Sequence, residues 1–335
     1  MISKTATSWQ TPASWQTALT QAIRDPAQLL QRLDLPLDLL PAAAAAARLF
    51  PLRVPHSYVR RMQAGNPHDP LLRQVLPLAA EFTAEPAGQT DPVGDLNAMA
   101  SPGLLHKYHG RALLVTTGAC AIHCRYCFRR HFPYAGANPL HQHREATLEY
   151  LRSHPDVNEL ILSGGDPLSL PDRQLAEWVQ ACEAIPHLHT LRLHTRLPVV
   201  LPERVNPELC DWLAGTRLAK VIVLHINHPQ EIDAEVSQAI CALRESGATL
   251  LNQSVLLRGV NDELATLTLL SQTLFANGIL PYYLHQFDPV QGAMHFAVPV
   301  AEGQTLVSGL RASLPGYLVP RYVQEIPGMA AKYPL

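Results

Sequence analysis

The chain has 335 residues, of which 47% are hydrophobic and 16% are charged, and its formal net charge is −2. This length can bury one large core, and no run of about 18 apolar residues predicts a membrane span. The balanced charge argues against nucleic acid as the main partner, because no basic field covers the surface. The N-terminal sequence MISKTATSWQTPASW lacks the pattern of a secretion signal, so we expect a cytoplasmic protein.

Residues 1–95 are predicted to form a helical N-terminal region and a linker. The stretches WQTALTQAIRD and PAAAAAARLF predict helices, because alanine has the highest helix propensity and prolines bracket the alanine run. The stretch PHSYVRRMQAGNPHDPLLRQVLP, residues 55–77, is interrupted by proline and glycine. It predicts an extended linker that wraps around a second domain.

Residues 96–310 are predicted to form an α/β fold, in which short apolar runs alternate with amphipathic stretches. The runs cover residues 112–117, 159–163, 190–195, 220–226, 249–257 and 282–287. After the first gap, their spacing matches the length of a strand–helix unit. We therefore expect an incomplete (β/α)6 parallel barrel, with its active site at the carboxyl ends of the strands.

Three of the six cysteines are close together, directly after the first predicted strand. Cys120, Cys124 and Cys127 have the spacing C-x3-C-x2-C, with no fourth cysteine nearby. A zinc site would need a further ligand such as His123 or His131. An iron–sulfur cluster held by three thiolates would leave one iron open to another ligand. The remaining cysteines are predicted to be small buried side chains: Cys182, Cys210 and Cys241.

A second motif, LSGGDPL, follows the second predicted strand. Its adjacent glycines allow close approach of a ligand, although they also fit a tight turn before a helix. Together with C-x3-C-x2-C, it resembles the radical S-adenosylmethionine (SAM) superfamily. The resemblance implies a [4Fe–4S] cluster whose open iron binds the methionine moiety of SAM. It also implies that SAM contacts Ser163, Gly164, Gly165 and Asp166. His225 and Gln253 match the SAM contacts of the superfamily more loosely.

The resemblance narrows to the lysine 2,3-aminomutase family, which uses pyridoxal 5′-phosphate (PLP) as well as SAM. It rests on HKYHGRALLVTTGACAIHCRYCFRR, SGGDP, RLPVVLPERV, NQSVLLRGVND and EIPGMAAK, and covers about residues 65–335. The implied PLP Schiff-base lysine is Lys332, in a C-terminal segment, 311–335, that closes the active site. Four glycines often precede this lysine in the family, whereas this chain has Gly-Met-Ala-Ala.

The same resemblance assigns the remaining site residues. It implies that Arg111 binds the PLP phosphate with help from Lys107 and Tyr108. The implied contact of the substrate α-carboxylate is Arg129. The distal ammonium group of the substrate would lie between two carboxylates, which can neutralise a buried cation: Asp288 and Glu325.

The resemblance implies conversion of L-lysine to β-lysine through a 5′-deoxyadenosyl radical. The compact chain, ending at Leu335, resembles the bacterial form that supplies (R)-β-lysine for elongation factor P. A reductase or flavodoxin-type protein would donate the electron, and the oligomeric state is left open. Three alternatives remain at this point. They are an aminomutase for glutamate or arginine, a radical SAM enzyme that modifies RNA or protein, and a zinc-stabilised binding module.

Overall fold

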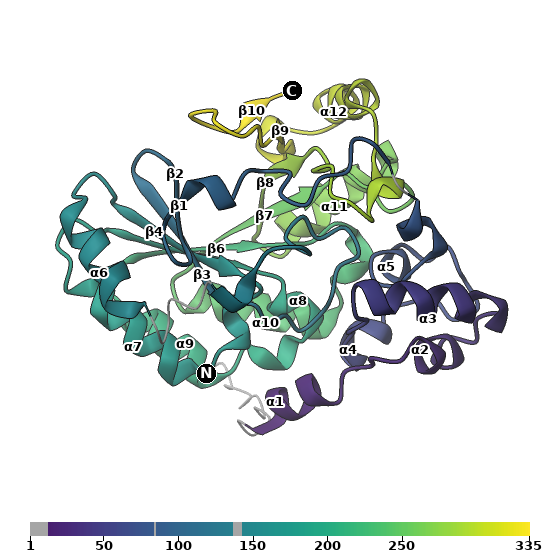
Figure 1. Ribbon diagram of the computed structural model, residues 1–335, viewed down its shortest axis with the longest axis horizontal. Coiled ribbons are helices and arrows are strands. Elements are labelled where there is room, and N and C mark those ends of the chain that lie inside the picture. Colours follow the sequence, from purple (N-terminus) through teal and green to yellow (C-terminus); the bar gives the residue numbers. More distant parts are fainter. Residues whose placement is uncertain (1–12, 84, 137–142) are drawn as a thin grey trace, which may run out of the picture.

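The computed structural model describes residues 13–83, 85–136 and 143–335, and its centre is one sheet of ten strands in sequential order (Figure 1). The strands are β1 (Met99–Ser101), β2 (Leu104–Tyr108), β3 (Arg111–Thr117), β4 (Glu159–Gly164), β5 (Thr190–Thr195), β6 (Ala219–Leu224), β7 (Thr249–Val255), β8 (Leu280–His285), β9 (Arg321–Gln324) and β10 (Tyr333–Pro334). Neighbouring strands from β3 to β9 are parallel. The predicted open parallel barrel is confirmed, and all six predicted strands are present as β3 to β8.

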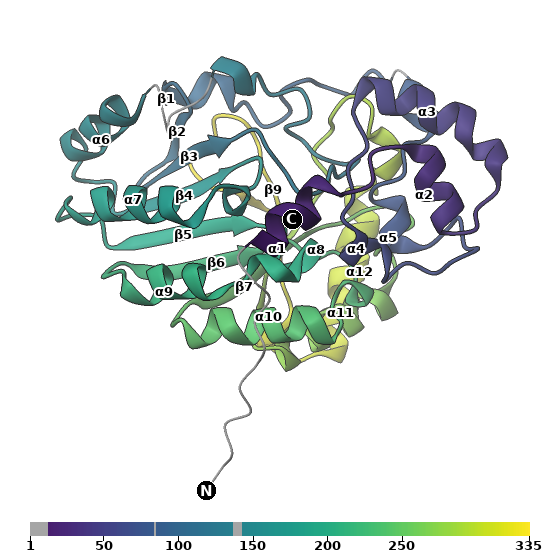
Figure 2. The same ribbon diagram turned by 90° about the horizontal axis from the view of Figure 1, so that it is seen from below.

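Helices connect the parallel strands and lie along the outer face of the sheet, as α7, α9 and α10 do in Figure 2. The α-helices are α1 (Ala13–Thr20), α2 (Pro26–Arg32), α3 (Leu40–Leu49), α4 (His56–Val59), α5 (Pro70–Arg73), α6 (Arg144–Ser153), α7 (Asp172–Glu183), α8 (Leu197–Val200), α9 (Pro207–Gly215), α10 (Ala234–Glu245), α11 (Leu264–Ala276) and α12 (Val300–Ser313). Among the described residues, no helix has the length and apolar character needed to cross a bilayer.

The sheet extends beyond the predicted strands at both edges. Strand β2 forms a hairpin with β3, and the turn contains Gly110 at a φ of 78°. At the other edge, β9 pairs in parallel with β8, and β10 pairs antiparallel with β9. Glu325 follows β9 and Lys332 precedes β10, so the last turn of the sheet carries two of the predicted site residues.

The stretch 55–77, predicted as an extended linker, contains helices α4 and α5 and is largely buried, so that prediction is wrong. Proline begins α5, where its missing N–H leaves no helical hydrogen bond unmade. Tyr58 and Leu72 are fully buried in the same apolar cluster as Leu191 of β5. The N-terminal helices therefore share a core with the sheet.

All three scattered cysteines were predicted to be buried, but only one of them is. Cys182 is buried on α7, Cys210 is half-buried on α9, and Cys241 is exposed on α10. The buried face of α10 includes Val236 and Leu243, and Cys241 lies outside that face. Cysteine is commonly a core residue, but its position on an amphipathic helix decides its burial.

Because the N-terminal helices share the main core, Leu72→Ala should destabilise the whole protein. Removing a fully buried leucine side chain typically costs about 2–5 kcal/mol. Urea unfolding followed by tryptophan fluorescence and circular dichroism should show one transition at a lower urea concentration. Leu49→Ala, at a side chain that is 62% exposed, should cost well under half as much. Two separate transitions would show that the N-terminal helices fold independently.

Candidate active site

One cavity of about 440 Å³ lies at the carboxyl ends of the strands, where the predicted barrel should place its active site. Every residue that the sequence predicts as a member of the site lines this cavity: Lys107, Tyr108, Arg111, Cys120, Cys124, Cys127, Arg129, Ser163, Gly164, Gly165, Asp166, His225, Gln253, Asp288, Glu325 and Lys332. Residues more than 200 positions apart in the chain thus meet in one place. The individual roles of these residues remain predictions.

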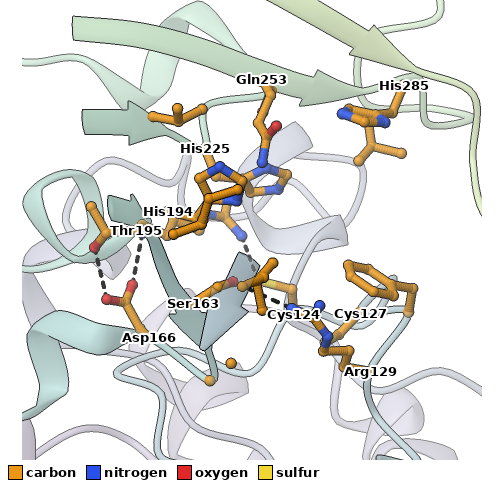
Figure 3. Close-up of a pocket in the computed structure, with 18 of the residues that line it drawn as sticks. Cys124, Cys127, Arg129, Ser163, Asp166, His194, Thr195, His225, Gln253 and His285 are labelled. Atoms are coloured by element: carbon orange, nitrogen blue, oxygen red, sulfur yellow. Dashed lines mark hydrogen bonds between the residues drawn. The ribbon is translucent and has the colours of Figure 1, made fainter. Parts of the chain in front are cut away.

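The three clustered cysteines line the cavity as free thiols, and Figure 3 shows two of them, Cys124 and Cys127. Burial raises the pKa of the Cys127 thiol to about 11, and the neighbouring Cys124 adds to this effect. In the described part of the chain, no three Cys, His, Asp or Glu side chains converge on a single ion. A [4Fe–4S] cluster does not need that convergence, because each thiolate binds a different iron atom.

The backbone conformation and the lack of space at the end of β4 require glycine at positions 164 and 165. Gly164 has a φ of 118°, and a Cβ on Gly165 would lie 2.3 Å from the carbonyl oxygen of Ala119. The Gly165 amide donates to the Thr117 carbonyl over 2.6 Å, and the Asp166 amide donates to the Ala119 carbonyl over 2.8 Å. The backbone just before Cys120 therefore packs directly against this turn, and both glycines also line the cavity.

Asp166 anchors the end of β5 rather than offering free oxygens to the cavity. Its carboxylate accepts hydrogen bonds from the Thr195 hydroxyl at 2.7 Å and from the backbone amides of Arg196 and Leu197 at 2.7 and 3.1 Å. A fourth comes from the Leu168 amide at 3.0 Å, in the turn that follows the glycines. Asp166 therefore links the cysteine side of the cavity to the loop after β5.

The opposite wall carries His225 and Gln253, which point toward the cysteines in Figure 3. Burial, with Arg196 nearby, lowers the pKa of His225 to about 4. The Nδ1 atom of His225 lies 3.0 Å from the Gln253 carbonyl, and Nε2 lies 2.8 Å from the Tyr126 hydroxyl. A carbonyl can only accept, so Nδ1 carries the proton and Nε2 accepts from Tyr126.

Five alternating charges cross the cavity floor. Arg129 Nε lies 2.6 Å from Asp95, which lies 2.6 Å from Lys107 Nζ. Lys107 Nζ lies 2.9 Å from Glu325, which also pairs with Lys332. Burial alone would raise the pKa of Glu325, but Lys332 and Lys107 outweigh it and hold the pKa at about 2. Asp95, which no sequence motif indicated, joins Arg129, the predicted contact of the substrate α-carboxylate, to Lys107, a predicted contact of the PLP phosphate.

Lys107 and Arg111, both predicted to bind phosphate, differ in what they offer to a ligand. An ammonium group has three donors, and Lys107 directs its ammonium at Asp95, Glu325 and the Val93 carbonyl. It would have to exchange a partner to bind phosphate. Arg111 lines the cavity with its guanidinium 4.8 Å from the centre of the Tyr108 ring. Arg111 is therefore the stronger candidate for an anion contact.

Asp288 adds to the same cavity a carboxyl group whose pKa lies well above its usual value. Burial, reinforced by the negative charge of Glu325, raises the pKa of Asp288 to about 7. A cationic group placed beside it would reverse this shift, because an opposite charge favours the ionised carboxylate. The pair Asp288 and Glu325 is thus suited to receive one more positive charge.

The comparisons with known proteins agree with this geometry. Residues 114–270 match the radical SAM superfamily. The chain is 48% identical over 322 residues to the L-lysine 2,3-aminomutase of Escherichia coli (strain K12), covering 96% of this chain and 94% of that protein. The chain belongs to the lysine 2,3-aminomutase family. The proteins of the same name from Haemophilus influenzae and Buchnera aphidicola are 48% and 43% identical, covering 94% and 95% of this chain and 93% and 94% of theirs.

The cofactors of the lysine 2,3-aminomutase family are a [4Fe–4S] cluster, SAM and PLP, and the donors in this cavity fit them. Three free thiols on one loop can bind three irons of a cluster. The wall that would face SAM offers the Gln253 side chain and the turn at Gly164. Lys332 would supply the primary amine that PLP requires, and Arg111 would supply a cation for its phosphate.

Gly165→Ala should displace the cysteine loop, because the added Cβ would collide with the Ala119 carbonyl. We expect a several-fold loss of bound iron after anaerobic reconstitution, measured by iron analysis and the visible absorption of the cluster. Gly215→Ala is the matched control, since a Cβ there meets nothing within 4 Å. Normal iron binding by Gly165→Ala would contradict the tight docking of the two loops.

Asp288→Asn should change how stability depends on pH. The folded protein keeps the Asp288 proton up to about pH 7, whereas the unfolded chain releases it near the ordinary value of 3.8. Stability of the wild type should therefore fall by up to about 1.4 kcal/mol per pH unit across this window, relative to the variant. Urea unfolding of the cofactor-free protein at about pH 5, 6, 7 and 8 measures this difference. Asp38→Asn, at an exposed position, should follow the wild type throughout.

Proposed function

We propose that the protein is an L-lysine 2,3-aminomutase that converts L-lysine to β-lysine. The observation that carries the proposal is the content of one cavity, which joins three cysteines, a lysine, an arginine and two carboxylates. The curated relatives, at up to 48% identity over nearly the whole chain, bear the name of this activity. No second function is favoured by a specific feature of the cavity.

The cysteines Cys120, Cys124 and Cys127 would hold the cluster, and Lys332 would hold PLP. When bound, the cluster and SAM supply a carbon radical that can remove a hydrogen atom, and PLP supplies a conjugated ring for the migrating nitrogen. The chain itself positions these groups and keeps water away from them. Buried side chains such as Tyr126 and Phe287 line the cavity and exclude solvent.

Arg129 would bind the α-carboxylate of the substrate. Burial alone would lower its pKa, but the contact with Asp95 outweighs burial and raises it, so the guanidinium remains charged. Its Nη1 lies 3.3 Å from the Ser163 hydroxyl, on the strand that ends in the glycine turn. The carboxylate end of the substrate would therefore lie near the cluster.

Asp288 and Glu325 would bind the distal ammonium group. Glu325 pairs with the Lys332 ammonium, which supports the proposal that this carboxylate can bind an alkylammonium group. A substrate cation would also bring Asp288 back to its ionised form. Two acidic groups at this end favour a diamino acid over glutamate, whose distal carboxylate they would repel.

The finer biological setting is part of the proposal and rests on the resemblance. The product would be (R)-β-lysine for the modification of elongation factor P in the cytoplasm. A flavodoxin-type protein or its reductase would deliver the electron. These proposals concern partners of the enzyme, and the cavity described above does not depend on them.

The test is an anaerobic assay with L-lysine, SAM, PLP and a one-electron reductant, followed by chromatography of the amino acids. The wild type should form β-lysine, and Lys332→Ala should lose at least about a thousandfold in rate, because Lys107, the other lysine that lines the cavity, is already paired with Asp95 and Glu325. Glu325→Gln should raise KM for lysine by at least tenfold, since half of the carboxylate pair is lost. L-Glutamate in place of lysine controls for substrate class.

The outcomes separate the alternatives. No β-lysine from a protein with an intact cluster would show that the substrate assignment is wrong. Conversion of glutamate or arginine in preference to lysine would support an aminomutase of another specificity. A colourless protein that contains zinc would overturn the radical mechanism altogether.

A further inference from the structure

Arg196, immediately after β5, makes a direct contact with one of the proposed cluster ligands. Its Nη1 atom lies 2.7 Å from Cys124 Sγ and 2.8 Å from the Tyr126 hydroxyl. The side chain is only 6% exposed and lines the cavity. A guanidinium keeps its positive charge in folded proteins. A full positive charge therefore lies beside a sulfur of the cysteine loop, in a site of low dielectric.

The Glu231 carboxylate forms an ion pair with Arg196 through the guanidinium nitrogen that does not contact Cys124. Glu231 is fully buried, and its Oε2 lies 2.9 Å from Arg196 Nη2. The other oxygen, Oε1, accepts from the backbone amides of Asn227 and His228 at 2.9 and 3.1 Å. These contacts fix the carboxylate, so the distance between the two charges is set by the fold.

Arg196 is also held in place by the glycine turn and by two residues of the N-terminal region. Its backbone amide donates to Asp166, as described above, which ties it to the glycine turn. Its Nη2 atom donates to the Gln74 side-chain oxygen at 2.6 Å and to the Tyr58 hydroxyl at 3.0 Å, both in the N-terminal region. Removing the Arg196 and Glu231 charges from water costs free energy that their attraction does not always offset. A buried ion pair is therefore weak evidence of a contribution to stability.

We propose that Arg196 is a positioning residue that raises the reduction potential of the cluster by donating a hydrogen bond to the Cys124 thiolate, and that Glu231 limits the size of this effect. The proposal rests on the proposed cluster site. Reduction adds one electron to the cluster, so its reduced form is more negative and gains more from a nearby cation. Hydrogen bonds to sulfur and local net charge are established determinants of cluster potentials.

Two variants should shift the potential in opposite directions. Arg196→Gln removes the cation, so the cluster should become harder to reduce, by about tenfold in the equilibrium constant, which is about 59 mV for one electron. Glu231→Gln removes the balancing charge and should make the cluster easier to reduce. The measurement is a redox titration of the reconstituted protein without SAM, followed by electron paramagnetic resonance.

The controls separate charge from folding. Arg196→Lys keeps the cation and should retain most of the wild-type potential, even if Arg196→Gln folds poorly. Arg204→Gln disrupts another fully buried arginine, which pairs with Asp172 and lies outside the cavity lining. Its stability should fall while its potential stays at the wild-type value. A shift of equal size in Arg204→Gln would overturn the proposal.

Two further outcomes would also be decisive. If Arg196 only held the carboxylate of SAM, Arg196→Gln would weaken SAM binding and leave the potential of the SAM-free cluster unchanged, which would overturn the proposal. Iron analysis distinguishes failure of this proposal from failure of the cluster site. Wild-type protein that binds no iron would refute the cluster itself, whereas four irons with equal potentials in all variants would refute the role of Arg196 alone.

Discussion

The close contact between the glycine turn after β4 and the loop before Cys120 is the constraint on which the site depends. The glycine turn donates two backbone hydrogen bonds, of 2.6 and 2.8 Å, to the carbonyls just before Cys120, and no side chain fits between the two backbones. This contact fixes where the cysteines begin relative to the strands. Asp166 then extends the same arrangement to Thr195 and Arg196. The cysteine loop, the glycine turn and the end of β5 thus form one unit, although they come from three separate parts of the sequence.

The charges of the cavity follow from this arrangement together with the last turn of the sheet. Arg129 leaves the cysteine loop and meets Asp95, while Glu325 and Lys332 arrive from the segment around β9 and β10. Each of the five alternating charges described above has a neighbour of opposite sign, which offsets the cost of removing it from water. The chain of charges therefore allows one cavity to hold several ionised groups and still receive a charged substrate.

Sequence patterns predicted the parts of the molecule that repeat or that carry a motif. The six inner strands were found because they are mainly apolar runs of six or seven residues at regular spacing, whereas β2 and β9 have only five and four residues. Asp95 could not be placed, since it precedes the sheet in a loop whose path depends on tertiary packing. Arg196 could have been found, because it directly follows a predicted strand, in the position where barrel folds place functional side chains.

The sequence also did not indicate a role for the N-terminal region. Besides sharing the core, this region contacts the buried ion pair of Arg196 and Glu231. Gln74 accepts from Arg196 at 2.6 Å and donates to Glu231 at 3.2 Å, so it contacts both members of the buried ion pair. Its own backbone carbonyl accepts from the Arg125 amide, within the cysteine loop. A buried polar group without such partners would carry a large desolvation cost. Residues 55–77, whose prolines and Gly65 resemble a linker in sequence, therefore fold so that Gln74 and Tyr58 hold Arg196 at the wall of the cavity.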